Sequence, residues 1–450
     1  MQQDMTQGNP FPIILKFTIP LIIGNVFQQL YNMADTIIVG RYVGAGALAA
    51  VGSTGTIMFL LTGFSQGMTA GFSVLTSQRF GARDEDGVRK SVANAILLAV
   101  LTTLVLTSFS LMLMKQLLHL MNTPSDIYAD AYTYIMLISA GLIANIFYNL
   151  FSALLRAVGN SKAPLVFLVF SACLNVLLDL FFIIHFNMGV AGAAVATNLS
   201  QGISAVLCII YIYARVPELK PGRGHWKLDR GDSKNQLRMG IPMAFQFAIT
   251  ASGTMIMQSA INLFGSTAVA AFTAASKLQN VLTQGMVAMG QTMAAYAGQN
   301  FGSRNLKRIH MGVKAALKIE VIYSLVVALL VVLLLPHVIG LFFSGEVDIL
   351  SMLPWAKTYL YLCVIFYIPL STIFIFRNTM QGCGYGLLPM LGGAAEFFAR
   401  LLVASAAIYL VSFPLACTCD PAAWVAAAIF TGVSYRYVMR DIENKYGKHA

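Results

Sequence analysis

The chain has 450 residues, of which 58% are hydrophobic and only 10% are charged, and its mean hydropathy is +0.73. About a quarter of the residues of an ordinary soluble protein are charged, so this composition excludes a soluble globular fold and predicts a polytopic membrane protein. The net charge of +11 does not indicate a nucleic-acid partner, because the sequence contains no solvated domain that mixes basic with aromatic residues.

Twelve apolar segments follow one another along the chain, and each is long enough to cross hydrocarbon about 30 Å thick, which takes around 20 helical residues. Their approximate limits are 12–38, 47–77, 90–115, 127–155, 162–185, 189–214, 236–263, 267–298, 311–336, 350–377, 387–412 and 420–439. We therefore expect an all-α integral membrane protein with twelve transmembrane helices.

The sequence repeats itself in its second half. Residues 78–84 (QRFGARD) reappear as residues 299–305 (QNFGSRN), and the pair Ile19-Pro20 reappears as Ile241-Pro242. The duplication predicts two lobes of six helices each, an N-lobe over 1–214 and a C-lobe over 236–450. Because six is even, the lobes share one orientation and are related by a pseudo-two-fold axis along the membrane normal, an arrangement that suggests alternating access.

Most Lys and Arg residues fall in the two tails and in the even-numbered connections between the predicted helices. Since basic residues are retained on the cytosolic side, both termini should be cytoplasmic. The polar stretch 215–235 lies midway between the repeats, and we interpret it as a cytoplasmic linker between the lobes.

Polar residues inside the first and fifth helices are candidates for an ion site, because a charge in mid-bilayer costs at least about 2.5 kcal/mol and persists mainly beside a cavity or a partner. Gln28, Asn32 and Asp35 step by three or four residues and so share one helix face. Asn175 and Asp179 are one turn apart, and Thr197 in the next helix adds a hydroxyl.

Two carboxylates, an amide and a hydroxyl form a plausible site for a cation or a proton. Oxygen ligands suit a hard ion such as Na⁺, whereas two carboxylates close together can instead hold a proton. The sequence does not decide between Na⁺ and a proton. In the alternative interpretation, Asp35 lies near the outer interface and Asp179 merely pairs with a neighbour.

The C-lobe offers Lys277 in the eighth helix and the pair Glu396 and Arg400, four residues apart in the eleventh. A Glu followed by Arg at this spacing is a favourable helix pair. We favour a structural ion pair that Lys277 could complete, and substrate binding or gating is the alternative.

Three further positions bear on transport. Met286 and Met289 share a face of the eighth helix, and flexible thioethers could line a cavity for varied apolar cations, although most such faces are packing. Pro20 can bend the first helix, because it removes one backbone hydrogen bond and its ring clashes with the preceding turn.

The paired Gln-x-Phe-Gly-x-Arg motifs, the two Ile-Pro pairs, and the segments 31–36 (YNMADT) and 189–197 (GVAGAAVAT) resemble the multidrug and toxic compound extrusion (MATE) family over nearly the whole chain. Asn175 and Asp179, with no acid in the tenth helix, resemble its DinF-like branch. The resemblance implies a prokaryotic inner (plasma) membrane protein, a monomer, that exports amphipathic, often cationic small molecules in exchange for H⁺ or Na⁺, with no other cofactor.

In that branch, the positions matching Asp35, Asn175, Asp179 and Thr197 form a network that binds the coupling ion. Tyr134 is expected at its edge. Any Na⁺ would be held by the first four residues, and no other metal site is expected.

Two other function classes, a flippase and an enzyme, require different residues inside the membrane. A flippase for a lipid-linked precursor, from the same wider superfamily, should line its cavity with several basic residues, whereas Lys277 and Arg400 are the ones expected well inside helices. An integral-membrane enzyme would need a catalytic constellation, but the six histidines are scattered along the chain and the sequence contains no H-E-x-x-H motif. We therefore expect a transporter and not an enzyme.

Overall fold

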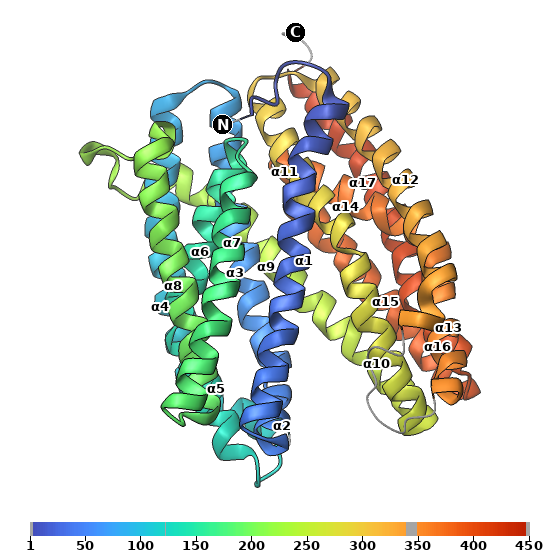
Figure 1. The fold of residues 1–450 in the computed structure, drawn as a ribbon. Coiled ribbons are helices and arrows are strands. Elements are labelled where there is room, and N and C mark those ends of the chain that lie inside the picture. The colour runs from blue at the N-terminus through green and yellow to red at the C-terminus, as the bar shows by residue number, and fades with distance from the viewer. Residues whose placement is uncertain (1–2, 122, 339–348, 447–450) are drawn as a thin grey trace. The chain divides into compact units, whose positions relative to one another are not determined.

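The computed structural model describes residues 3–121, 123–338 and 349–446, and the elements in these ranges are all helical (Figure 1). They form two compact units. Unit 1 contains residues 3–4 and Ile23–Ala244, and unit 2 contains Met5–Ile22 and the described part of Phe245–Ala450.

Unit 1 is built from the first half of the chain. Its helices are α1 (Pro10–Tyr42, from Ile23 on), α2 (Ala45–Ser53), α3 (Gly55–Gly81), α4 (Glu85–Leu120), α5 (Tyr128–Ala140), α6 (Leu142–Ala157), α7 (Lys162–Leu180) with the π-helical η1 (Phe181–His185), α8 (Gly189–Arg215), the short η2 (Pro217–Leu219) and η3 (Arg223–His225), and α9 (Arg230–Ile261, up to Ala244). Helix α6 packs against α3 and α8. The apolar core of this unit gathers between these helices.

Unit 2 is built from the second half and the start of α1. Its further elements are η4 (Asn262–Phe264), α10 (Gly265–Leu282), α11 (Gln284–Gly302), α12 (Leu306–Val338), α13 (Ile349–Ile365), α14 (Tyr367–Gly382), α15 (Leu387–Leu410), α16 (Phe413–Cys417) and α17 (Cys419–Tyr446). Helix α14 packs against α11 and α17, as α6 packs in unit 1 against α3 and α8.

The described helices account for the predicted crossings. Nine helical segments are long and apolar enough to span a membrane, and two bent pairs raise this number to eleven. One of the segments, Arg230–Gly302, has 73 residues and contains α9, α10 and α11, which is far too long for one crossing. The prediction of an all-α membrane protein with a twelve-helix, two-lobe layout is confirmed.

Many exposed side chains of the helices are apolar and the buried ones include polar groups, as expected for helices surrounded by lipid. On α12, Ile322, Leu329 and Leu333 are each more than half exposed, whereas Glu320 and Ser324 are each 2% exposed. Such a helix turns its apolar face to lipid and its polar residues inward.

The repeated motif folds the same way in both halves. Helices α3 and α11 end at Gly81 and Gly302, and Arg83 and Arg304 both take a left-handed φ of 57°. Asp84 then accepts a hydrogen bond from the Gly87 N–H (2.9 Å) at the start of α4. Its counterpart Asn305 accepts one from the Arg308 N–H (3.0 Å) at the start of α12. The duplication is therefore visible down to the helix caps.

Two crossings are bent where the sequence predicts plain spans. Helices α5 and α6 meet at 47° around Gly141, and α13 and α14 meet at 52° around Phe366. Asn198 occupies the space beside Gly141 and donates to the Leu137 carbonyl (2.7 Å), which the bend leaves accessible. Because Gly141 has no side chain, the Asn198 side chain fits beside it.

The first turns of α1 belong to unit 2, and the first turns of α9 belong to unit 1. The boundary between them falls after Ile22 in α1 and after Ala244 in α9, in each case two residues beyond a proline, Pro20 or Pro242. Helix α1 runs on through Pro20 as a single element. The linker is bounded by Arg215 and Arg230, so its predicted end at 235 lies within α9.

Candidate cation-coupling site

A buried polar cluster in unit 1 joins α7 and α8. Asn175 and Asp179 are 0% exposed and Thr197 is 3% exposed. The Asn175 side-chain amide donates to the Thr197 hydroxyl (3.3 Å). With its amide rotated by half a turn, Asn175 donates instead to Asp179 Oδ2 (3.2 Å) and accepts from the Thr197 N–H (3.2 Å). In either orientation Asn175 lies between the hydroxyl and the carboxyl group.

Asp35 reaches this cluster from α1. Its carboxyl group lies within hydrogen-bonding reach of the Asp179 carboxyl group. One oxygen of each, Asp35 Oδ1 and Asp179 Oδ1, is buried and has no hydrogen-bond partner among the described residues. Two carboxyl groups so close repel when both are charged, so the pair suits a shared proton or a bound cation.

Two tyrosines flank the carboxyl pair. The Tyr31 hydroxyl lies near Thr197 and Gln201 and interacts electrostatically with both aspartates. Tyr134 is 1% exposed, also interacts electrostatically with both, and donates to Met58 Sδ (3.7 Å). The structure thus brings Asp35, Asn175, Asp179, Thr197 and Tyr134 together in one place.

Tyr31 and Gln201 were missed in the sequence. A helical signal existed for both, since Tyr31 precedes Asp35 by one turn and Gln201 follows Thr197 by one turn. Gln28 is half-buried and Asn32 is exposed, and within the ranges that the structure describes no hydrogen bond joins either side chain to the cluster.

The C-lobe ion pair is part of a larger network in unit 2. Glu396 pairs with Arg377 of α14 and with Arg400 (3.6 Å). The Arg400 Nε–H donates to Asp420 Oδ1 (3.0 Å), and the Tyr359 hydroxyl donates to Asp420 Oδ2 (2.9 Å). Positive and negative groups therefore alternate along the network.

Lys277 does not complete this network, which corrects the sequence-based prediction. It is exposed on α10, and the structure gives it no ion pair in the part of the chain that it describes. The third and fourth members are instead Arg377 and Asp420. Arg377 lies at the end of a predicted span and Asp420 at the start of another, so hydropathy alone does not place either residue inside the membrane.

The two methionines do not line an open cavity in this structure. Met286 and Met289 are both 0% exposed and belong to the apolar core of unit 2. The Thr18 hydroxyl lies 3.9 Å from Met289 Sδ. Their observed role is packing, for which unbranched thioethers are well suited.

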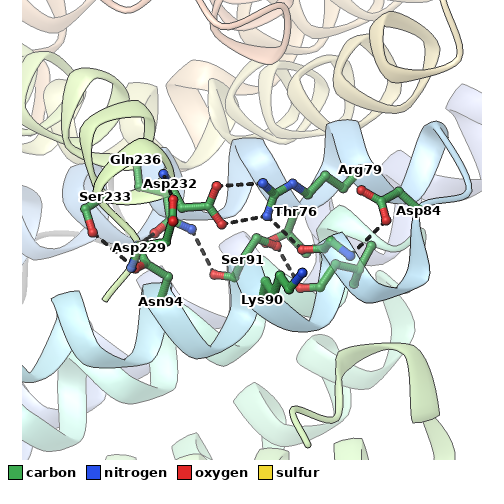
Figure 2. Close-up of polar contacts among 12 residues, drawn as sticks. Thr76, Arg79, Asp84, Lys90, Ser91, Asn94, Asp229, Asp232, Ser233 and Gln236 are labelled. Carbon is green, nitrogen blue, oxygen red and sulfur yellow. Dashed lines mark hydrogen bonds and ion pairs between the residues drawn. The ribbon is translucent and has the colours of Figure 1, made fainter. Parts of the chain in front are cut away.

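A second polar cluster in unit 1 fixes the start of α9 (Figure 2). We call Arg79, Asn94, Asp229, Asp232 and Gln236 the linker cluster. The Arg79 guanidinium donates to both oxygens of Asp232 at 2.6 Å. Asn94 donates to Gln236 Oε1 (2.8 Å) and accepts from the Asp229 N–H (3.0 Å). A bidentate pair of this kind is directional as well as charged, so it fixes the orientation of α9 on α3 and α4.

Unit 2 holds the segment before α1 in a related way. Asn300, which stands at the position of Arg79 in the repeat, donates to the Met5 carbonyl (3.2 Å). Arg308 of α12 donates to the carbonyl groups of Met5 (2.9 Å), Gln7 (2.6 Å) and Gly8 (2.6 Å), just before α1.

Comparison with known proteins identifies the family. The MatE family model matches residues 20–181 and 242–404, which are the two repeats. "Probable multidrug resistance protein YpnP" of Bacillus subtilis is 32% identical over 308 residues, 68% of each chain, and "Probable multidrug resistance protein YoeA" of the same organism is 25% identical over 337 residues, 73% of each chain.

Solved structures agree on the fold. A crystal structure of MATE in complex with MaL6 superposes with a TM-score of 0.91 and 22% identity, covering 98% of this chain and 99% of that one. The predicted resemblance is therefore confirmed at the level of the family. The chain belongs to the MATE family and is a multi-pass membrane transporter.

Proposed function

We propose that this protein is a secondary active antiporter of the plasma membrane, which exports amphipathic, cationic small molecules in exchange for H⁺ or Na⁺. The observation that carries the proposal is the approach of the Asp35 and Asp179 carboxyl groups, each of which has one buried oxygen without a hydrogen-bond partner among the described residues. The names of the bacterial relatives support multidrug export.

The carboxyl pair couples two fluxes by competition. When it is ionised, it attracts a cationic substrate, and it also binds the coupling ion. Once a proton or Na⁺ neutralises it, the attraction for the substrate falls. Each state then favours a different conformation of α1, in which Pro20 lowers the cost of bending because one backbone hydrogen bond is already missing.

An ion gradient supplies enough energy for this exchange. One elementary charge moved through 100 mV is worth about 2.3 kcal/mol, to which the concentration gradient adds. The sequence has no G-x-x-x-x-G-K-[ST] motif, in keeping with a transporter that does not hydrolyse ATP.

The topology and the branch belong to the same proposal. The distribution of basic residues supports cytoplasmic termini and a cytoplasmic linker. Asn175 and Asp179 support the DinF-like branch. We further expect a monomer, since each unit has its own apolar core.

The flippase alternative receives less support. It calls for basic side chains available to a pyrophosphate, whereas Arg377 and Arg400 are paired with Glu396 and Asp420. Their charge is already balanced, so they do not form an anion site in the described structure.

The test is efflux of a fluorescent lipophilic cation from proteoliposomes under an imposed H⁺ gradient and, separately, a Na⁺ gradient. We expect one gradient to drive efflux by the wild-type protein, and Asp179→Asn to abolish it. Asp130→Asn, an exposed aspartate at the start of α5, is the matched control and should transport normally. Full gradient-driven efflux by Asp179→Asn would contradict the assignment.

A further inference from the structure

Unit 2 contains a buried carboxyl group outside both the Asp35 and Asp179 pair and the Arg400 network. Glu320 lies near the middle of the 33-residue helix α12 and is 2% exposed. Its Oε2 atom is buried and has no hydrogen-bond partner in the described part of the chain. An acid at this depth is costly, and the usual reason for one is an ion or proton pathway.

The surroundings of Glu320 are hydroxyl groups. Ser371 of α14 lies near its carboxyl group. Ser324, one turn further along α12, is 3.1 Å from Ser371 Oγ. The buried Tyr367 hydroxyl has no partner among the described residues, whereas Tyr323 donates to the Leu282 carbonyl (2.7 Å). Polar groups from α12 and α14 thus meet in one buried cluster.

Among the residues that the structure describes, no Lys, Arg or His forms an ion pair with Glu320. Helix α12 packs against α11, α13 and α14, and the described parts of these helices contribute no ion pair to it. Its titratable neighbour is Tyr323, which interacts with Glu320 electrostatically and in turn with Tyr367. A negative charge here would have no compensating partner, whereas a neutral carboxylic acid needs none.

The repeat shows that the fold does not require this cluster. The shared register of α4 with α12 places Ala99 and Thr103 at the positions of Glu320 and Ser324. The shared register of α6 with α14 places Leu142 and Ile146 at the positions of Tyr367 and Ser371. Ala99, Leu142 and Ile146 belong to the apolar core of unit 1. The same helix contact therefore packs well without any acid.

The cluster lies at a structural break. Tyr367 is the first residue of α14, directly after the 52° bend that separates it from α13. Pro369 has no backbone N–H, so the Ile365 carbonyl cannot receive its usual helical hydrogen bond. A broken helix with accessible backbone groups is a place where transporters bind coupling ions.

We propose that Glu320 is a second proton-binding site, separate from the Asp35 and Asp179 pair, which takes up and releases one proton in each transport cycle. The inference rests on the proposed function for its role in transport. The carboxylate accepts the proton from water reaching the cluster in one conformation and returns it to water in the other. Ser371, which contacts Ser324, orients the carboxyl group.

The direct test is infrared difference spectroscopy between low and high pH on the purified protein in lipid. We expect a carboxylic-acid C=O stretching band in the wild type that disappears in Glu320→Gln and persists in Asp179→Asn. Glu443→Gln, an exposed glutamate on α17, is the matched control. Glu320→Asp keeps a carboxyl group and should retain the band at a shifted position.

An unchanged set of bands in Glu320→Gln would overturn the proposal. So would a band that responds to Na⁺ at constant pH, because that would assign a sodium site. In proteoliposomes, proton uptake per exported cation should fall by one in Glu320→Gln. Export without any proton uptake by the wild type would overturn the proposal while leaving a sodium-coupled antiporter intact. Loss of the proton in Glu320→Gln with normal export by Asp179→Asn would contradict the proposed function alone.

Discussion

At the residue scale, unit 2 stabilises buried charge by pairing it. Arg377, Glu396, Arg400 and Asp420 are each less than 10% exposed, and the network contains two positive and two negative groups. Such a network contributes little net stability relative to apolar packing, but removing one member leaves a buried charge without compensation.

Asp420→Asn should therefore destabilise the protein markedly. It leaves Arg400 with only the longer contact to Glu396, and breaking a buried pair typically costs about 3–5 kcal/mol. We expect a lower melting temperature in detergent. The double variant Arg400→Gln with Asp420→Asn retains the balanced Arg377 and Glu396 pair and should recover part of the loss. A single variant as stable as the wild type would contradict this interpretation.

Sequence reasoning found those site residues that helical spacing connects. Asn175 and Asp179 are one turn apart on one helix, so their shared face could be predicted. The other members of the network around Arg400 and Glu396 are Arg377, Asp420 and Tyr359, which come from three other helices, and no spacing rule connects them. Glu320 was overlooked because a single acid in a long apolar helix leaves the average hydropathy high.

At the element scale, hydrocarbon thickness made the number and order of the helices predictable. The ends of the helices were less predictable, because α4 and α12 extend beyond their apolar segments by polar turns that a hydropathy average does not detect. The bends at Gly141 and Phe366 were also missed, since each bent pair is apolar enough to pass as one span. A bend depends on what packs into it, as Asn198 does beside Gly141.

The linker cluster provides a test at this scale. Arg79 and Asp232 are far apart in sequence and partly buried, and their bidentate geometry should make them energetically coupled. A double-mutant cycle with Arg79→Ala and Asp232→Ala, read by thermal unfolding, should give a coupling of about 0.5–3 kcal/mol. Arg79→Lys should not restore stability, because an ammonium cannot donate in a bidentate manner. Strictly additive effects would show that the pair does not stabilise the start of α9.

At the scale of the whole molecule, the duplication predicted two lobes, but not where the polypeptide passes from one to the other. The change of unit falls within α1 and α9, two residues after Pro20 and Pro242, and not at the linker. Sequence repeats mark homologous segments, whereas compact units follow contacts. The leading turns of each repeat make their contacts with the other half of the chain.

The central claim is that the Asp35 and Asp179 pair binds either the coupling ion or a cationic substrate. The most direct measurement is the affinity of the purified protein for a fluorescent lipophilic cation across a range of pH and, separately, of Na⁺ concentration. We predict that lowering the pH or adding Na⁺ weakens binding to the wild type. The double variant Asp35→Asn with Asp179→Asn should bind weakly and respond to neither. Tight wild-type binding that is insensitive to both ions would contradict the account.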